Sequence, residues 1–319
     1  MAVLGYKLSS EEHPPSDLVR YARRAEEAGF SFGLISDHFH PWVDRQGHSP
    51  FVWSVIGGIA TATERFRLGT GVTCPTIRIH PAIVAQAAAT SEAMMPGRFF
   101  LGVGSGENLN EHILGDRWPE VEVRLEMLDE AIEVIRLLFE GGQKSHHGKH
   151  YTIENARLYT LPDEPPPIYV AASGSKAATL AGRLGDGLVS VAPSAEIVEE
   201  FESSGGRTKP KYAEVVVSWG RDRAKAEGVA YEWWPNAGLK GQLNQELPVP
   251  AHFQEAAEMV TKEDIAGAVV CGSDVDEHIE NLQEYADAGY DHLCVHQIGP
   301  DQAGFLDFYR DQVLPKFGD

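Results

Sequence analysis

Short apolar runs alternate along the chain with segments in which apolar residues recur every three or four positions. The short runs predict buried strands, because each spans only a few residues and ends at glycine or at polar residues. The predicted strands cover residues 3–7, 32–35, 67–72, 99–104, 168–171, 187–191, 212–218, 268–271 and 292–296.

The segments between these runs have the spacing of helices that bury one face. A first helix is predicted to be capped by Ser16 or Asp17 and to end at Gly29, and a late one to be capped by Ser273 or Asp274. Further helices are predicted over residues 51–63, 81–93, 121–139, 176–184 and 303–313. Two segments depart from the repeat: residues 143–161 predict a hairpin, and residues 221–261 a helix followed by a long insertion.

About eight strands alternating with helices predict a parallel sheet with helices outside it. A closed (β/α)8 TIM barrel in one domain, residues 1–319, fits this count and the chain length. A doubly wound open sheet is the alternative. The glycine-rich stretch at residues 102–107 lacks the third glycine of the dinucleotide-binding motif, and a full helix does not follow it, so we reject the nucleotide-binding sheet.

Composition narrows the choice of partners. The formal net charge of -20 argues against nucleic acid or an anionic membrane as a partner, and it suits either a high-salt cytoplasm or an ordinary acidic enzyme. We find no signal segment and no run near the roughly 20 apolar residues of a membrane span, so we expect a cytoplasmic protein. The three cysteines show no spacing typical of a disulfide framework or a zinc site.

The residues that best carry chemistry follow the second predicted strand. Asp37 and His38 stand at its end, and Trp42 follows closely. Imidazole can accept a proton near neutrality, and a neighbouring carboxylate can fix its tautomer. By itself, the Asp-His pair could equally be a buried pair that only satisfies backbone groups.

Other strand ends supply an acid and several small residues. In a barrel the loops after the strands meet at one face, so these residues converge. Small residues let a flat ligand approach the backbone, and residues 172–175 ahead of a helix suit a phosphate, although an ordinary helix cap has the same pattern. The strand-end residues are Glu11, Gly71, Val72, Cys74, Gly106, Glu107, Ala171, Ala172, Ser173, Gly174 and Ser175.

Several motifs together resemble the deazaflavin-dependent glucose-6-phosphate dehydrogenase family of the bacterial-luciferase-like barrels. The resemblance is colinear over nearly the whole chain and weakest from about residue 195 to 260. The motifs are Leu4-Gly5-Tyr6-Lys7, Ser36-Asp37-His38-Phe39 with Pro41-Trp42, Gly47-His48 with Pro50-Phe51, Leu68-Gly69-Thr70, residues 102–107 with Asn110-Glu111, and Ala181-Gly182-Arg183 with Gly185-Asp186-Gly187.

The resemblance implies coenzyme F420, a deazaflavin that accepts a hydride, with its phosphate tail near Gly174. It makes His38 the base on the substrate hydroxyl, backed by Asp37 or Glu11, places Glu107 by the cofactor ring nitrogen, and makes Trp42 and Glu11 further site residues. It also places a non-prolyl cis peptide at Gly71-Val72. The implied cofactor-binding residues are Asp37, Gly71, Val72, Cys74, Gly106, Glu107, Asn110, Ala171, Ala172, Ser173, Gly174 and Ser175.

The chain departs from this family where its sugar-phosphate enzymes hold the substrate phosphate. The matching positions are Ser194, about Leu243, and Ala268, none of which is basic. Lys240 is the nearest basic residue that could take their place. The insertion instead offers an aromatic wall for a neutral substrate, which resembles the related deazaflavin-dependent secondary alcohol dehydrogenases. The wall residues are Tyr231, Trp233, Trp234 and Phe253.

We therefore expect an F420-dependent oxidoreductase that transfers a hydride between deazaflavin and an alcohol, ketone or sugar. The alternatives are a true sugar-6-phosphate dehydrogenase, an FMN-dependent monooxygenase on the same fold, and a cofactor-binding protein without catalysis. The family implies a homodimer that pairs through helices beside the early strands. We expect no metal at His146, His147 and His150, which lie on a polar hairpin, and we interpret Cys74 as a lining residue rather than a nucleophile.

Overall fold

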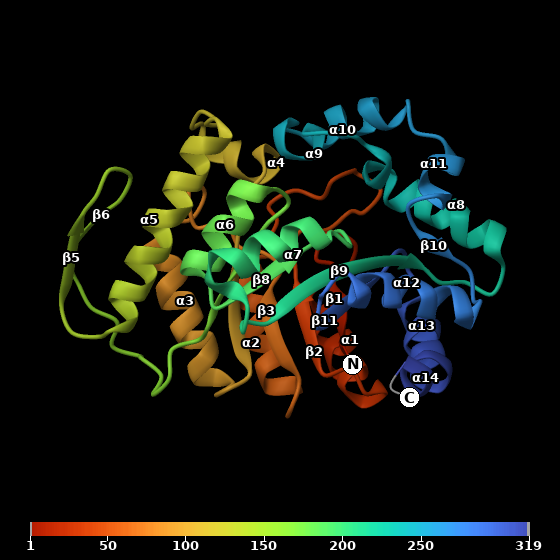
Figure 1. Ribbon diagram of the computed structural model, residues 1–319, viewed down its shortest axis with the longest axis horizontal. Coiled ribbons are helices and arrows are strands. Elements are labelled where there is room, and N and C mark those ends of the chain that lie inside the picture. Colours follow the sequence, from red (N-terminus) through yellow and green to blue (C-terminus); the bar gives the residue numbers. More distant parts are fainter. Residues whose placement is uncertain (1, 318–319) are drawn as a thin grey trace.

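Eight parallel strands close into a barrel in the computed structural model, which describes residues 2–317 (Figure 1). Each strand pairs with the next, β9 pairs with both β8 and β11, and β11 pairs with β1 to close the ring. The predicted (β/α)8 barrel is therefore confirmed. Its strands are β1 (Val3–Leu8), β2 (Phe32–Ile35), β3 (Arg67–Thr70), β4 (Phe99–Val103), β7 (Ile168–Ala171), β8 (Gly187–Ser190), β9 (Lys211–Ser218) and β11 (His292–Gln297).

Helices surround the barrel at the positions predicted from the apolar spacing, and α7, which was not predicted, adds one more. α1 begins at Pro15 rather than after a Ser16 or Asp17 cap, because Pro14 has the extended backbone of a cap residue and Pro15 suits the first helical position. It ends at Gly29, which has a φ of 103°. Asp274 caps α12, as expected. The helices around the barrel are α1 (Pro15–Ala28), α2 (Val52–Ala62), α3 (Pro81–Met94), α5 (Val121–Phe139), α6 (Ser175–Leu184), α7 (Ala195–Phe201), α12 (Val275–Asp287) and α13 (Gln302–Phe308).

The barrel interior is packed with aromatic rings that strand glycines accommodate. Phe100 lies opposite Gly69, where an added Cβ would come within 1.9 Å of its ring. The rings of Phe32 and Tyr212 meet edge to face, with centroids 5.0 Å apart. This layer fills one part of the barrel, so an open site has to lie at the loops beyond the strand ends.

Two segments extend the basic barrel. The predicted hairpin is confirmed as β5 (Lys144–His147) paired antiparallel with β6 (Thr152–Ala156), which lies outside α5 in Figure 1. The insertion after β9 forms a group of helices that lies along one side of the barrel in Figure 1. These helices are α8 (Arg223–Trp233), α9 (Leu243–Glu246), α10 (Pro250–Ala257) and α11 (Lys262–Ala266).

One predicted barrel strand is wrong. Residues 268–271 contain only β10 (Val270–Cys271), which pairs with Val217 and Ser218 at the end of β9. The barrel positions on both sides of β9 are already taken by β8 and β11, so this apolar run can only extend the sheet at its rim. Within residues 2–317, no helix combines the length and apolarity needed to cross a membrane.

Candidate active site

Three predicted site residues surround His38 in the loop after β2. The Nδ1 atom of His38 lies 3.2 Å from the carbonyl oxygen of His40 and 3.4 Å from Glu11 Oε1, while its Nε2 atom lies 3.3 Å from Glu107 Oε2. The ring of Trp42 lies beside it, with centroids 5.2 Å apart. Nδ1 therefore faces two acceptors and carries a proton in the neutral ring, which leaves the lone pair on Nε2.

Glu11 lies behind His38 as a buried carboxylate. Its Oε2 atom accepts hydrogen bonds from Ser36 Oγ at 2.5 Å and from Ser9 Oγ at 3.1 Å. Burial by itself raises the pKa of Glu11, but attraction to His38 and Lys7 and the bond from Ser36 outweigh it and leave the pKa lowered. The Glu11 carboxylate is therefore held in its ionised form beside the imidazole.

Glu107 lies on the opposite side of His38 and behaves differently. Burial raises the pKa of its carboxyl, as does the Glu11 charge, and attraction to His38 only partly offsets this. About a third of its side-chain surface, 32%, faces solvent. Asn110 Nδ2 donates to Glu107 Oε2 at 3.1 Å, and Asn110 Oδ1 accepts from the backbone N–H groups of Phe39 and His40, which fixes the amide.

Asp37 does not back His38, which resolves the open choice in favour of Glu11. The Asp37 carboxylate accepts from Thr73 Oγ1 at 2.8 Å and from Arg78 Nη2 at 2.9 Å. Arg78 also bonds Glu111, through its backbone N–H at 2.8 Å and through Nε at 3.4 Å. Sequence reasoning missed Arg78, although a lone arginine in a strand-end loop facing two acids could have indicated this role.

The loops after β3 and β4 pack closely through their small residues. The Gly71–Val72 peptide is cis, as the resemblance implied. A Cβ added at Gly104 would lie 2.8 Å from Val72, and one at Gly106, which has a φ of 85°, would lie 2.5 Å from the Cys74 sulfur. Burial raises the pKa of the Cys74 thiol well above its ordinary value, so this side chain fills space.

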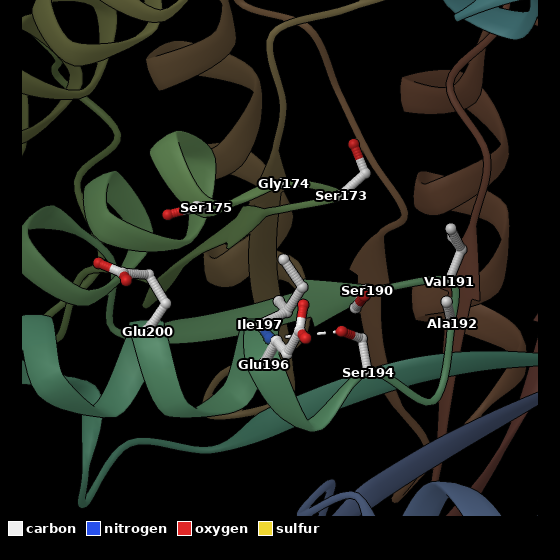
Figure 2. A pocket seen from close by; sticks show the side chains of 10 residues that line it. All are labelled: Ser173, Gly174, Ser175, Ser190, Val191, Ala192, Ser194, Glu196, Ile197 and Glu200. Atoms are coloured by element: carbon white, nitrogen blue, oxygen red, sulfur yellow. Dashed lines mark hydrogen bonds between the residues drawn. The ribbon is translucent and has the colours of Figure 1, made fainter. Parts of the chain in front are cut away.

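A cavity of about 550 Å³ opens between the loops after β7 and β8 (Figure 2). Ser173, Gly174 and Ser175 line it together with Ser194 and Glu196. Two further predicted residues take other positions: Ala172 is buried in the main core, and Ala171 packs against the barrel interior. The cavity borders the N-terminal end of α6, which is where the sequence predicts that a phosphate binds.

The insertion contributes part of the predicted aromatic wall. The rings of Phe253 and Trp42 meet edge to face at 5.2 Å, and Trp234 meets His296 in the same way at 4.6 Å. Trp233 instead lies under the guanidinium of Arg45, 4.5 Å from its ring centroid. Tyr231 faces Lys262. Trp234 and Phe253 are therefore the wall residues that contact side chains of the site and the barrel interior.

Sequence reasoning also missed a set of charged side chains inside the barrel. They lie on β1 and the loop after it, on β9 and on β11. The sequence feature that could have revealed them is a charged residue at an inward-facing position of an otherwise apolar strand. These residues are Lys7, Glu12, Glu214 and His296.

The hairpin histidines pair with acids instead of with one another. His146 Nε2 lies 3.1 Å from Glu130, and His147 Nε2 lies 3.1 Å from Glu154. In the part of the chain that the structure describes, no group of three or more His, Cys, Asp or Glu side chains is arranged to hold a metal ion.

Comparison with known proteins places this chain in a family. The family model described as luciferase-like monooxygenase matches residues 2–292. The chain belongs to the luciferase-like monooxygenase family. It is 38% identical to an F420-dependent glucose-6-phosphate dehydrogenase of Beutenbergia cavernae, over 99% of this chain and 97% of that protein. The resemblance inferred from the motifs is therefore confirmed.

Two solved structures share the fold of this luciferase-like barrel over its length. An F420-dependent secondary alcohol dehydrogenase in complex with an F420-acetone adduct superposes with a TM-score of 0.92 and 32% identity, covering 100% of this chain and 99% of that chain. A coenzyme F420 dependent tetrahydromethanopterin reductase from Methanopyrus kandleri superposes with a TM-score of 0.81. It covers 99% of both chains, and at 22% identity it supports the fold alone.

Proposed function

We propose that this luciferase-like chain is a coenzyme F420-dependent dehydrogenase that interconverts a small secondary alcohol and its ketone, with His38 as the base. The observation that carries the proposal is the arrangement of His38 between an ionised Glu11 and a carboxyl of raised pKa, Glu107, beside the uncharged Trp42. Oxidation of a carbinol needs a base for the hydroxyl proton and an acceptor for the hydride; a fixed anion stabilises the protonated base, and a donor stabilises negative charge that develops on the acceptor.

F420 dependence follows from the relatives, whose names specify this cofactor. The residues of this chain fit it. Gly71 and Gly106 are half-buried strand-end positions without side chains, which lets a flat ring approach the backbone, and Ser173 and Ser175 line a cavity for a tail. When bound, the deazaflavin supplies the ring carbon that accepts or returns the hydride.

His38 accepts the proton that must leave the hydroxyl when a carbinol becomes a carbonyl. Its Nδ1–H is directed at His40 and Glu11, so Nε2, which lies 3.3 Å from Glu107 Oε2, is the nitrogen that takes up the proton. The negative charge of Glu11 stabilises the imidazolium that results. A positioned base of this kind accelerates proton transfer by roughly two to four orders of magnitude.

Glu107 serves as a neutral donor to negative charge that develops beside it. A carboxyl with a raised pKa keeps its proton to a higher pH than an ordinary glutamate does. Asn110 donates a hydrogen bond to this carboxyl, and the Asn110 amide is itself held by the backbone N–H of Phe39. Glu107 and His38 thus divide the acid and base roles, because their surroundings favour opposite protonation states.

The surroundings favour an uncharged substrate. The basic side chains around the site and its loops are paired with carboxylates: Lys7 with Glu214, Arg45 with Glu232, Arg78 with Asp37, Arg124 with Glu246 and Lys176 with Glu122. Lys240 is exposed, and its charge acts on Asp264. Ser194 caps α7, and Leu243 and Ala268 are exposed apolar residues. A buried dianion would be left unpaired here.

A second candidate function is glucose-6-phosphate oxidation, which the name of the 38% identical relative favours. The two candidates differ in substrate charge. A charge-assisted phosphate contact is worth roughly 1.5–3 kcal/mol, so the absence of three would lower catalytic efficiency by several powers of ten.

The deciding experiment measures kcat/KM from the loss of oxidised F420 absorbance with 2-butanol, glucose and glucose 6-phosphate. Cofactor and salt are held constant, and FMN replaces F420 in a parallel series. We expect 2-butanol to be preferred and FMN to support no oxidation. A more than tenfold preference for glucose 6-phosphate would contradict the proposal and favour the second candidate.

A further inference from the structure

Four charged side chains form one hydrogen-bonded row inside the barrel, which we call the interior charge chain: Lys7, Glu214, His296 and Glu12. Lys7 Nζ lies 2.6 Å from Glu214 Oε2. The other Glu214 oxygen lies 3.0 Å from His296 Nδ1, and His296 Nε2 lies 2.8 Å from Glu12 Oε2. The row joins β1 and the loop after it to β9 and β11.

Both ends of the interior charge chain are bonded to backbone. Lys7 Nζ donates to the carbonyl oxygen of Gly71 at 3.0 Å, and Glu12 Oε1 accepts from the N–H of Gly299 at 2.8 Å. The side chains of His296 and Glu12 are completely buried. Hydrogen bonds and charges from Glu12 and Glu214 outweigh burial and raise the pKa of His296 to about 9, so at neutral pH the ring is doubly protonated and two cations balance two anions.

This row reaches the active site at three points. Lys7 bonds the Gly71 carbonyl in the loop after β3, and its charge contributes to the lowered pKa of Glu11. Glu12 follows Glu11 in the chain, so the two carboxyls are fixed by one short loop. His296 contacts Trp234, which belongs to the aromatic wall.

We propose that the interior charge chain positions the active site, with Lys7 as the positioning residue that keeps Glu11 ionised behind His38 and holds the Gly71 carbonyl. This inference rests on the proposed role of His38. Lys7 acts only through Glu11 and Gly71. The groups that face Lys7 are Glu214 from β9, Cys294 from β11 and Glu11, and those that face His38 are Glu11 and Glu107.

The proposal predicts pH shifts of opposite sign. Removing the positive charge of Lys7 favours proton uptake by the His38–Glu11 pair, whichever member takes the proton, so the pair titrates at higher pH. Removing the negative charge of Glu214 leaves Lys7 uncompensated and has the opposite effect. A residue that only supports the fold produces no such reversal.

The test compares Lys7→Met and Glu214→Gln, each made alone, with the double variant Lys7→Met/Glu214→Gln, in which the two charge losses offset each other. Glu92→Gln is the matched control, because Glu92 is a buried carboxylate that accepts from the N–H groups of Gly97 and Phe99 outside the site. The readouts are the NMR titration of the 15N-labelled His38 ring, assigned with His38→Asn, and the acid limb of kcat/KM.

We expect both readouts to move up by about half a pH unit or more in Lys7→Met, to move down in Glu214→Gln, to fall between these two in the double variant, and to stay unchanged in the control. No shift, or shifts in the same direction, would overturn the proposal. If Lys7→Met does not fold, the downward shift in Glu214→Gln and its reversal in the double variant decide. The NMR titration needs no turnover, so it stands even if the proposed dehydrogenase activity is not found.

Discussion

At the scale of single residues, the chemistry of this site depends on two carboxyls that differ in protonation beside one imidazole. Glu11 receives hydroxyl donors and lies near Lys7, which favours the anion, whereas Glu107 receives one amide donor and lies near the Glu11 charge, which favours the neutral acid. The same residue type therefore serves two roles because of its neighbours.

Replacing His38 with alanine removes the proposed base without removing a cofactor-packing group. We expect turnover to fall by roughly two to four orders of magnitude while F420 affinity stays within about tenfold. Fluorescence titration measures the affinity, and added imidazole should restore part of the rate. Unchanged turnover would exclude His38 from the mechanism.

Glu107→Gln preserves the shape of the side chain and removes its titration. The proposed donor role requires the neutral acid, and the raised pKa keeps Glu107 neutral to a higher pH than an ordinary glutamate. Wild-type activity should therefore fall as the pH rises through that pKa. The variant should be slower by about tenfold and should lose this alkaline limb. A pH profile of kcat/KM identical to that of the wild type would leave Glu107 as a structural residue.

At the scale of elements, the loops after β3 and β4 and the interior charge chain decide where the site residues stand. The loop after β4 turns at Gly106, where the positive φ and the nearby Cys74 sulfur exclude a side chain. Charged side chains of β1, β9 and β11 point into the barrel and form ion pairs with one another and with Glu12.

Gly106→Ala should destabilise the fold by about 1–3 kcal/mol, because its Cβ enters a left-handed conformation 2.5 Å from the Cys74 sulfur. Urea unfolding measures the loss, and adding Cys74→Ala should recover part of it. Gly174→Ala is the control, since its φ is -157° and no atom lies within 4 Å of the added Cβ. Equal effects of both alanines would contradict this account.

The pairing of His296 predicts how stability depends on pH. Hydrogen bonds and charges from Glu12 and Glu214 outweigh burial and raise the pKa of His296 from 6.5 to about 9. A raised imidazole pKa stabilises the fold fully below pH 6.5, and this contribution is lost as pH rises to about 9. His296→Gln should lower the urea midpoint of unfolding and make it vary less with pH between 6.5 and about 9. His147→Gln, at an exposed position, should leave the pH dependence of the midpoint as in the wild type.

At the scale of the whole molecule, the net charge of -20 is spread over a fold whose core is apolar. Repulsion among surface carboxylates opposes the compact state, and salt screens it. The melting temperature at pH 7.5 should therefore rise from 0.1 to 1 M KCl.

Near pH 5, close to the sequence pI of about 5.0, the net charge vanishes and this salt effect should shrink. Differential scanning calorimetry at both pH values measures it. The same salt effect at both pH values would show that the salt acts by means other than screening.

The amino-acid sequence by itself determined the barrel, its hairpin, and the presence of His38, Glu11, Glu107 and Trp42 at strand ends. These features depend on periodicity and local turns, which neighbouring residues specify. Only the tertiary structure decided that Glu11 rather than Asp37 backs His38, and that residues 268–271 lie outside the barrel. The partners of a buried charge, such as Lys7 and Glu214 on strands 207 positions apart, depend on barrel closure, which no local pattern encodes.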